Sequence, residues 1–129
     1  MTEDLQALID KGRRSLAAAR RDYDAGDYDL AVSRGYYAMF HLAVAALKTK
    51  GAEYRRHATV VAAFRDQFAS EGVFAPELHV AFGRAFGERT ISDYRYDQRV
   101  TQAPARQVLD DASRFVGEVE AYLRRSAGT

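Results

Sequence analysis

The sequence predicts an all-α protein, an antiparallel up-and-down bundle of four to five helices. Apolar residues recur at steps of three and four in five separate segments, and no segment keeps the alternation of a strand. The connections between the longer segments are short, which favours antiparallel neighbours. A chain of 129 residues can bury one hydrophobic core, so we expect residues 1–129 to form a single domain.

The first two predicted helices fill the N-terminal half of the chain. The first carries its apolar stripe from Leu5 to Tyr23, and Thr2 stands where a capping residue is expected. The second runs from Asp27 to about Lys50 and is apolar on more than one side. A helix with apolar residues on several sides is typically buried, so we expect this helix to be central.

Three further helices are predicted in the C-terminal half. A short helix spans His57 to Phe68, and a longer one begins near Pro76 and reaches Arg89, since proline is well tolerated in a first turn. The polar stretch from Ser92 to Gln102 is predicted to be irregular. The last helix opens near Pro104, and its narrow apolar seam needs a partner helix.

Several glycines fall inside these helical patterns, where each costs about 1 kcal/mol relative to alanine. We expect close approach of neighbouring helices to offset that cost, and the alternative is a backbone that faces a ligand. The glycines concerned are Gly35, Gly83, Gly87 and Gly117.

The composition excludes several classes of site. The chain has no cysteine, so it has no disulfide, thiolate metal site or cysteine nucleophile. Its three histidines are dispersed without paired ligand spacing, so we expect no metal and no cofactor. The net charge of +1 gives no overall attraction to nucleic acid, so such binding requires a local basic patch.

No membrane association is expected. The longest nearly uncharged stretch, Gly35 to Leu47, contains a histidine and is shorter than the roughly 20 apolar residues that cross a bilayer. The first residues carry acids and lack the basic-then-apolar pattern of an export signal. We therefore expect a cytoplasmic protein.

Arg34 is the most unusual residue of the predicted central helix. A guanidinium on a helix built for burial needs a partner, because an isolated buried charge is very costly. Asp93 and Glu88, near the end of the fourth predicted helix, are the candidate partners.

Two tyrosines follow in the run SRGYYAMFH, residues 33–41. Tyr36 and Tyr37 are adjacent, so they point about 100° apart on a helix and serve two faces. Tyr36 lies on the apolar stripe and is predicted to be core. Tyr37 shares a side with Arg34 and His41 and is predicted to pack, with a ligand pocket or a subunit contact as the alternative.

A second polar cluster, RTISDYRY, spans residues 89–96. Arg89 supplies charge for a phosphate, while the rings of Tyr94 and Tyr96 are suited to stacking on a base. The alternative is a charged helix end in which Arg89 pairs with Asp93 at i,i+4.

These motifs, taken in order, resemble the small HEPN proteins of bacteria and archaea. The resemblance rests on SRGYYAMFH, on His57 before an apolar run, and on RTISDY, and it covers the chain from about Leu5 to Leu123. It implies a helical bundle that usually dimerises. Many HEPN proteins are metal-independent ribonucleases, often toxins partnered by a nucleotidyltransferase, with an Arg-x4-6-His motif at the end of the penultimate long helix.

The sequence departs from that motif. Arg89 aligns with the family arginine, but Tyr94 stands five residues on, where histidine is expected, and Tyr96 takes the trailing tyrosine position. A phenol with a pKa of about 10 is a poor base at neutral pH. A literal Arg-x6-His match, Arg34 to His41, is not the motif, since seven helical residues separate the pair by about 10.5 Å.

Three functions remain open from the sequence. The first is a dimeric module that binds RNA or a nucleotide without standard catalysis. The second is an active ribonuclease toxin that uses a non-standard base, and the third is a subunit that docks a nucleotidyltransferase. In either partner model, the resemblance implies Tyr96 as the acceptor of a nucleotidyl group. The candidate catalytic residues are Arg89, Tyr94 and His57, and the candidate ligand-binding residues are Arg34, Tyr37, His41, Asp93 and Tyr96.

Overall fold

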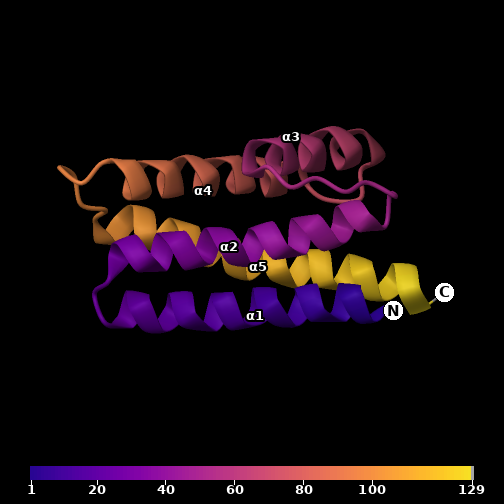
Figure 1. Ribbon diagram of the computed structural model, residues 1–129, viewed down its shortest axis with the longest axis horizontal. Helices are drawn as coiled ribbons and strands as arrows, with labels where there is room; N and C mark the ends of the chain where they lie inside the picture. The colour runs from indigo at the N-terminus through magenta and orange to yellow at the C-terminus, as the bar shows by residue number, and fades with distance from the viewer. Residues whose placement is uncertain (129) are drawn as a thin grey trace.

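The computed structural model describes residues 1–128 and confirms the all-α prediction. Four long helices alternate in direction, and the short helix α3 lies beside α4 at one edge of the bundle (Figure 1). Both ends of the chain lie at the same end of the bundle (Figure 1). The elements are α1 (Glu3–Asp24), α2 (Tyr28–Lys48), α3 (His57–Phe68), the 3-10 turn η1 (Ala69–Glu71), α4 (Pro76–Tyr94) and α5 (Gln102–Gly128).

The helix ends follow local signals in the sequence. The side chain of Thr2 accepts a hydrogen bond of 3.2 Å from the backbone N–H of Leu5, as expected of an N-cap. Gly26, Gly51 and Gly72 adopt positive φ angles of 82°, 72° and 67° after α1, α2 and η1. These three turns use a left-handed conformation that glycine adopts without steric cost.

Helix α2 is the centre of the bundle, with α1, α3, α4 and α5 all packed against it. By length and composition alone, α2 is the one helix of the described chain that is apolar enough to cross a membrane. However, 61% of its most apolar window is buried inside the bundle. Burial by four neighbouring helices accounts for its apolar character, as predicted for a central helix.

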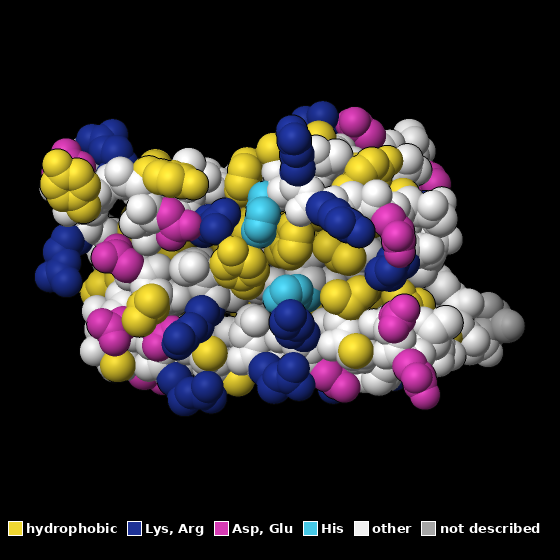
Figure 2. Space-filling model, in the orientation of Figure 1, with side chains coloured by type: hydrophobic (Ala, Val, Ile, Leu, Met, Phe, Trp, Pro, Cys, Tyr) yellow, Lys and Arg dark blue, Asp and Glu magenta, His cyan; other side chains and the backbone are white. Residues whose placement is uncertain are grey.

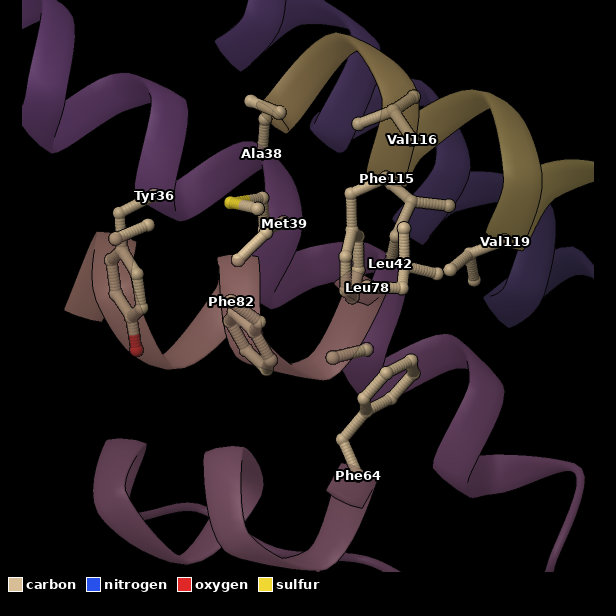
Figure 3. Close-up of a cluster of buried hydrophobic side chains, with 14 of the residues drawn as sticks. Tyr36, Ala38, Met39, Leu42, Phe64, Leu78, Phe82, Phe115, Val116 and Val119 are labelled. Carbon is tan, nitrogen blue, oxygen red and sulfur yellow. The ribbon is translucent and has the colours of Figure 1, made fainter. Parts of the chain in front are cut away.

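Aromatic side chains from four helices meet in the core between α2, α3, α4 and α5. Figure 3 shows Tyr36 of α2, Phe64 of α3, Phe82 of α4 and Phe115 of α5 around the same space. The ring of Phe115 lies 5.0 Å from that of Phe64 and 5.1 Å from that of Phe82. This packing fixes α3 and α4 relative to α2, which sets the position of the polar residues at their ends.

The expectation about helical glycines is right at one position and wrong at three. A Cβ at Gly35 would lie 3.0 Å from the side chain of Val108 of α5, so α2 and α5 approach closely at this glycine. The structure adds Gly12, where a Cβ would lie 2.2 Å from Leu42 of α2. No described atom outside the local backbone lies within 4 Å of a Cβ placed at Gly83, Gly87 or Gly117.

Helix α4 is longer than predicted. It continues through Tyr94, and the backbone N–H of Arg95 still bonds to the carbonyl of Ile91 at 2.9 Å. The extra turn is stabilised by contacts of its polar side chains, including a 2.7 Å ion pair between Arg89 and Asp93. The irregular connection therefore begins at residue 95 instead of residue 92.

Candidate functional site

The aromatic core ends in a polar cluster where α2, α3 and α4 meet. Tyr36 and Tyr37 come from the middle of α2, His57 is the first residue of α3, and Arg89 and Asp93 lie in the last turns of α4. We call these five residues the Arg89 centre. Residues from 36 to 93 are thus brought together by the packing of three helices.

Arg89 is held in place by aromatic and acidic neighbours. One of its terminal nitrogens, Nη2, donates a 3.0 Å hydrogen bond to the hydroxyl of Tyr37. Its guanidinium carbon lies 5.6 Å from the ring centroid of Tyr36 and 5.2 Å from that of Tyr37, within cation–π range. The ion pair predicted between Arg89 and Asp93 is confirmed.

Some N–H groups of the Arg89 guanidinium have no hydrogen-bond partner within residues 1–128. Arg89 Nε is buried and lies 2.7 Å from Oδ2 of Asp93, but its N–H makes no aligned hydrogen bond with a described residue. Its Nη1 also has no hydrogen-bond partner among residues 1–128. The buried Nε faces Asp93, so the N–H donors of Nη1 are the ones that remain for an anionic ligand.

His57 is fixed by a buried tyrosine. Its Nδ1 lies 2.8 Å from the hydroxyl of Tyr36, and its ring stacks on Phe40 with centroids 4.3 Å apart. Figure 3 shows the Tyr36 hydroxyl directed toward α3. With Tyr36 as donor, a neutral imidazole carries its proton on Nε2 and presents an N–H.

Both partners of this hydrogen bond are uncharged at neutral pH. Burial raises the pKa of Tyr36, so the phenol keeps its proton. Burial and then the nearby Arg89 lower the pKa of His57, so the imidazole stays neutral. The only charges within the Arg89 centre are therefore those of Arg89 and Asp93.

His41 adjoins the Arg89 centre on the side of α1. Its ring lies 6.1 Å from that of Tyr37, one turn earlier in α2. Burial first, and then the nearby Lys11 and His57, lower the pKa of His41 to about 4. A second neutral imidazole therefore lies beside Tyr37.

Arg34 does not join the Arg89 centre, and the prediction of Asp93 or Glu88 as its partner is wrong. Its side chain is 48% exposed and pairs with Asp22 of α1 at 2.7 Å. The face of α2 that carries Arg34 borders α1, whereas Asp93 belongs to α4 and forms an ion pair with Arg89. Arg34 therefore lies apart from His57 and Arg89, which both contact Tyr37.

Two of the predicted tyrosines also lie outside the centre. The exposed fraction is 78% for Tyr94 and 100% for Tyr96. Neither side chain makes a hydrogen bond or ring contact within the described part of the chain. Tyr94 is five residues beyond Arg89, which turns it away from the side of α4 that faces α2.

One contribution to the site was not anticipated from the sequence. Tyr36 was predicted as core packing, and it is fully buried, but its hydroxyl also positions His57. The available signal was the hydroxyl itself, because a buried tyrosine oxygen normally finds a polar partner.

Among residues 1–128, no three histidine, aspartate or glutamate side chains come together as a metal site.

Comparison with known proteins identifies the family. A family model of the HEPN domain matches residues 5–122. The chain belongs to the HEPN family. One relative of this HEPN domain is "Putative toxin MJ0142" of Methanocaldococcus jannaschii, 31% identical over 120 residues, which cover 93% of this chain and 82% of that protein.

The names of other relatives of this HEPN domain state a family and no activity. "UPF0332 protein glr0978" of Gloeobacter violaceus is 32% identical over 124 residues, covering 95% of this chain and 98% of that protein. A "UPF0332 protein" of Thermotoga maritima is 39% identical over 93 residues, covering 72% of this chain and 70% of its own length. The resemblance drawn from the sequence motifs is therefore confirmed.

Proposed function

We propose that this HEPN domain binds RNA or a nucleotide through a phosphate group at the Arg89 centre. The observation that carries the proposal is Arg89 itself, a guanidinium oriented by Tyr37 and Asp93 that still has free N–H donors. Guanidinium groups bind phosphate oxygens through paired hydrogen bonds. The partly exposed ring of Tyr37 beside it offers a surface on which a base can stack.

The hydrogen bonding of His57 favours binding over cleavage. With Tyr36 as donor to Nδ1, the Nε2 of His57 presents a proton and acts as a hydrogen-bond donor to an anion. A general base needs an unprotonated nitrogen at the same place. Tyr94, which replaces the histidine of the family motif, is exposed and outside the centre.

A ribonuclease remains the second candidate because His57 and Arg89 are neighbours in space. This activity requires the other tautomer, in which Nδ1–H donates to Tyr36 and Nε2 accepts a proton from the ribose 2′-hydroxyl. Two relatives from Methanocaldococcus jannaschii are named as toxins, which fits such an activity. Cleavage of RNA that disappears in Arg89→Ala would establish this second function.

A second copy of the chain is the proposed partner, and the outer face of α4 is the proposed contact. Val80, Ile91 and Tyr94 are 53%, 43% and 78% exposed along this face, and Gly83 and Gly87 lie between them with open space above. Small residues let a second helix approach closely. The face is therefore shaped for a helix that the monomer does not supply.

The charged residues of this face are complementary to the same residues of a second copy in antiparallel orientation. Glu88 forms no ion pair within residues 1–128, and Arg84 lies one turn before it, 46% exposed although paired with Asp111. In a two-fold pair centred between the two glycines, each Arg84 comes near the Glu88 of the other copy, and each Val80 meets an Ile91. Such a self-complementary patch is what a symmetric dimer requires.

Binding of 5′-AMP and of a single-stranded RNA 12-mer, measured by calorimetry, tests the proposed function. Arg89→Lys keeps the charge but removes the forked donors, so we expect about a tenfold or greater loss of affinity, since hydrogen bonds to charged groups contribute about 1.5–3 kcal/mol. Arg114→Lys is the matched control, because Arg114 forms a comparable i,i+4 ion pair with Glu118 on α5. Equal affinity in the wild type and Arg89→Lys would contradict the proposal.

A further inference from the structure

Basic side chains without an acidic partner gather on the two flanks of the Arg89 centre. Among residues 1–128, Lys11 and Arg14 on α1, and Arg55 and Arg56 directly before α3, form no ion pair. Glu53, the nearest acid in the sequence, is held by Lys48 at 2.7 Å. These four cations therefore present their full charge to solvent.

The basic residues of α5 contrast with these four cations. On α5, three arginines each pair with an acid one turn away, at distances from 2.6 to 3.2 Å. The pairs are Arg106 with Asp110, Arg114 with Glu118, and Arg124 with Glu120. The unpaired cations on α1 and before α3 thus differ from the paired arginines of α5. Arg20, Arg21 and Arg99 also form no ion pair within residues 1–128.

The residues between the two flanks form a continuous series. Lys11 is near enough to lower the pKa of His41, and the ring of His41 lies 6.1 Å from that of Tyr37. Tyr37 accepts the hydrogen bond from Arg89, and its ring is 5.5 Å from that of His57, the residue that follows Arg56. Figure 2 shows two histidine side chains on this face with basic side chains on both sides of them.

We propose that this face binds a single-stranded RNA across the Arg89 centre, with one phosphate subsite at Lys11 and Arg14 and another at Arg55 and Arg56. We call the whole series the α1–α3 band. The proposal rests on the function proposed above and specifies its ligand as a strand instead of a mononucleotide. Cations interleaved with aromatic rings are the arrangement that holds single strands without regard to sequence.

The width of the band favours a strand. Helices α1 and α3 lie on opposite sides of α2 (Figure 1). Packed helix axes are about 8–10 Å apart, so the two flanks are separated by roughly 16–20 Å. Successive phosphates of a stacked strand are separated by only several ångströms, with about 3.4 Å of rise per nucleotide, so one phosphate cannot reach both flanks but a strand of several nucleotides can.

A membrane is the less suitable anionic surface. Proteins that lie on a membrane insert large apolar side chains beside their basic residues. Tyr54, with 37% exposure, is the exposed large apolar residue next to the flank before α3. Val80, Ile91 and Tyr94 belong to α4, away from the band.

The salt dependence of RNA binding tests the α1–α3 band. Each phosphate contact on a single strand contributes about 0.7 to the slope of log affinity against log salt concentration, so Lys11→Gln with Arg14→Gln should reduce the slope for the RNA 12-mer by about 1.4. Arg55→Gln with Arg56→Gln should reduce it by a similar amount. Arg106→Gln with Arg114→Gln, on α5, is the matched control and should leave the slope as in the wild type.

The outcomes separate this proposal from the function on which it rests. If 5′-AMP binds in an Arg89-dependent way but the slope for RNA is unchanged in both double variants, the band is overturned and the function stands. If neither ligand depends on Arg89, both are overturned. If the double variants lose binding to phosphatidylserine vesicles while the wild type fails to bind RNA, the band is a membrane surface and the RNA proposal is wrong.

Discussion

His41 and His57 show how the environment of single residues sets the charge of the site. Each imidazole is partly buried, and each has a cation nearby, Lys11 for His41 and Arg89 for His57. Both effects disfavour a second positive charge, so the pKa of each histidine is lowered. The two rings therefore stay neutral at pH 7 and do not repel Arg89.

The same pKa shifts predict a stability that declines in mild acid. In the unfolded chain the pKa of His41 is about 6.5, and in the folded chain it is about 4, so between these values the unfolded state binds more protons. Stability is therefore complete above pH 6.5 and falls as the pH drops toward 4. We expect urea unfolding to show about 1–2 kcal/mol less stability at pH 5 than at pH 7, a discounted figure since His41 is partly exposed.

The variant His41→Gln isolates the contribution of this residue. Removing the titrating group should make the difference in unfolding free energy between pH 7 and pH 5 smaller than in the wild type. Lowering of the pKa of His57 acts in the same direction, so some dependence should persist. A His41→Gln variant with the full wild-type pH dependence would show that the folded pKa of His41 is not lowered.

At the scale of the helix, periodicity and end signals in the sequence predicted where each helix lies in the chain. They did not predict how each helix is rotated relative to its neighbours. The pattern from Leu5 to Tyr23 predicted α1 correctly, including Thr2 as its cap. It did not reveal that α1 covers the side of α2 that carries Arg34, which is why Asp22 was missed as the partner. Rotation depends on how several helices fill a shared core, and a single amphipathic stripe does not contain that information.

Two glycines in different helices should respond to alanine in opposite directions. At Gly12 a Cβ would meet Leu42, which is fully buried, and would lie 3.2 Å from the carbonyl of Ala38. Since the Leu42 side chain is fully buried and the Ala38 carbonyl belongs to the backbone of α2, we expect Gly12→Ala to destabilise the fold by about 1–3 kcal/mol. At Gly117 the space is open, so Gly117→Ala should stabilise it by about 0.5–1 kcal/mol through helix propensity.

Urea denaturation of the two variants beside the wild type provides the measurement. Gly117→Ala serves as the matched control, because both glycines lie inside long helices and the chemical change is identical. If Gly12→Ala also stabilised the protein, then the close contact between α1 and α2 would not exist in solution.

At the scale of the whole molecule, the motifs indicated which residues matter, but the fold decided which of them meet. His57 and Arg89 are 32 positions apart, and only the packing of α3 and α4 on α2 brings them together. Tyr94 and Tyr96 are in the same motif as Arg89, yet the end of α4 leaves both exposed. Proximity in the sequence therefore did not predict which residues meet, because Tyr94 and Tyr96 lie apart from the Arg89 centre whereas the hydroxyl of Tyr36 holds His57.

The assembly of two copies through α4 is the prediction that concerns the molecule as a whole. In the proposed antiparallel pair, Ile91 is buried against Val80 of the other copy on both sides of the axis. Ile91→Glu places an unpaired carboxylate at each contact, and we expect the dissociation constant of the dimer to rise at least about tenfold, because each 1.4 kcal/mol of lost binding is a factor of ten. Sedimentation equilibrium at micromolar concentration measures the change.

Leu30→Glu is the matched control for that experiment. Leu30 is 46% exposed, close to the 43% of Ile91, but it lies in the first turn of α2, where an added acid is compatible with the helix N-terminus. The control should therefore sediment as the wild type does. A wild-type monomer at these concentrations, or a dimer that Ile91→Glu leaves intact, would show that the outer face of α4 is not the contact, and the open space above Gly83 and Gly87 would need another occupant.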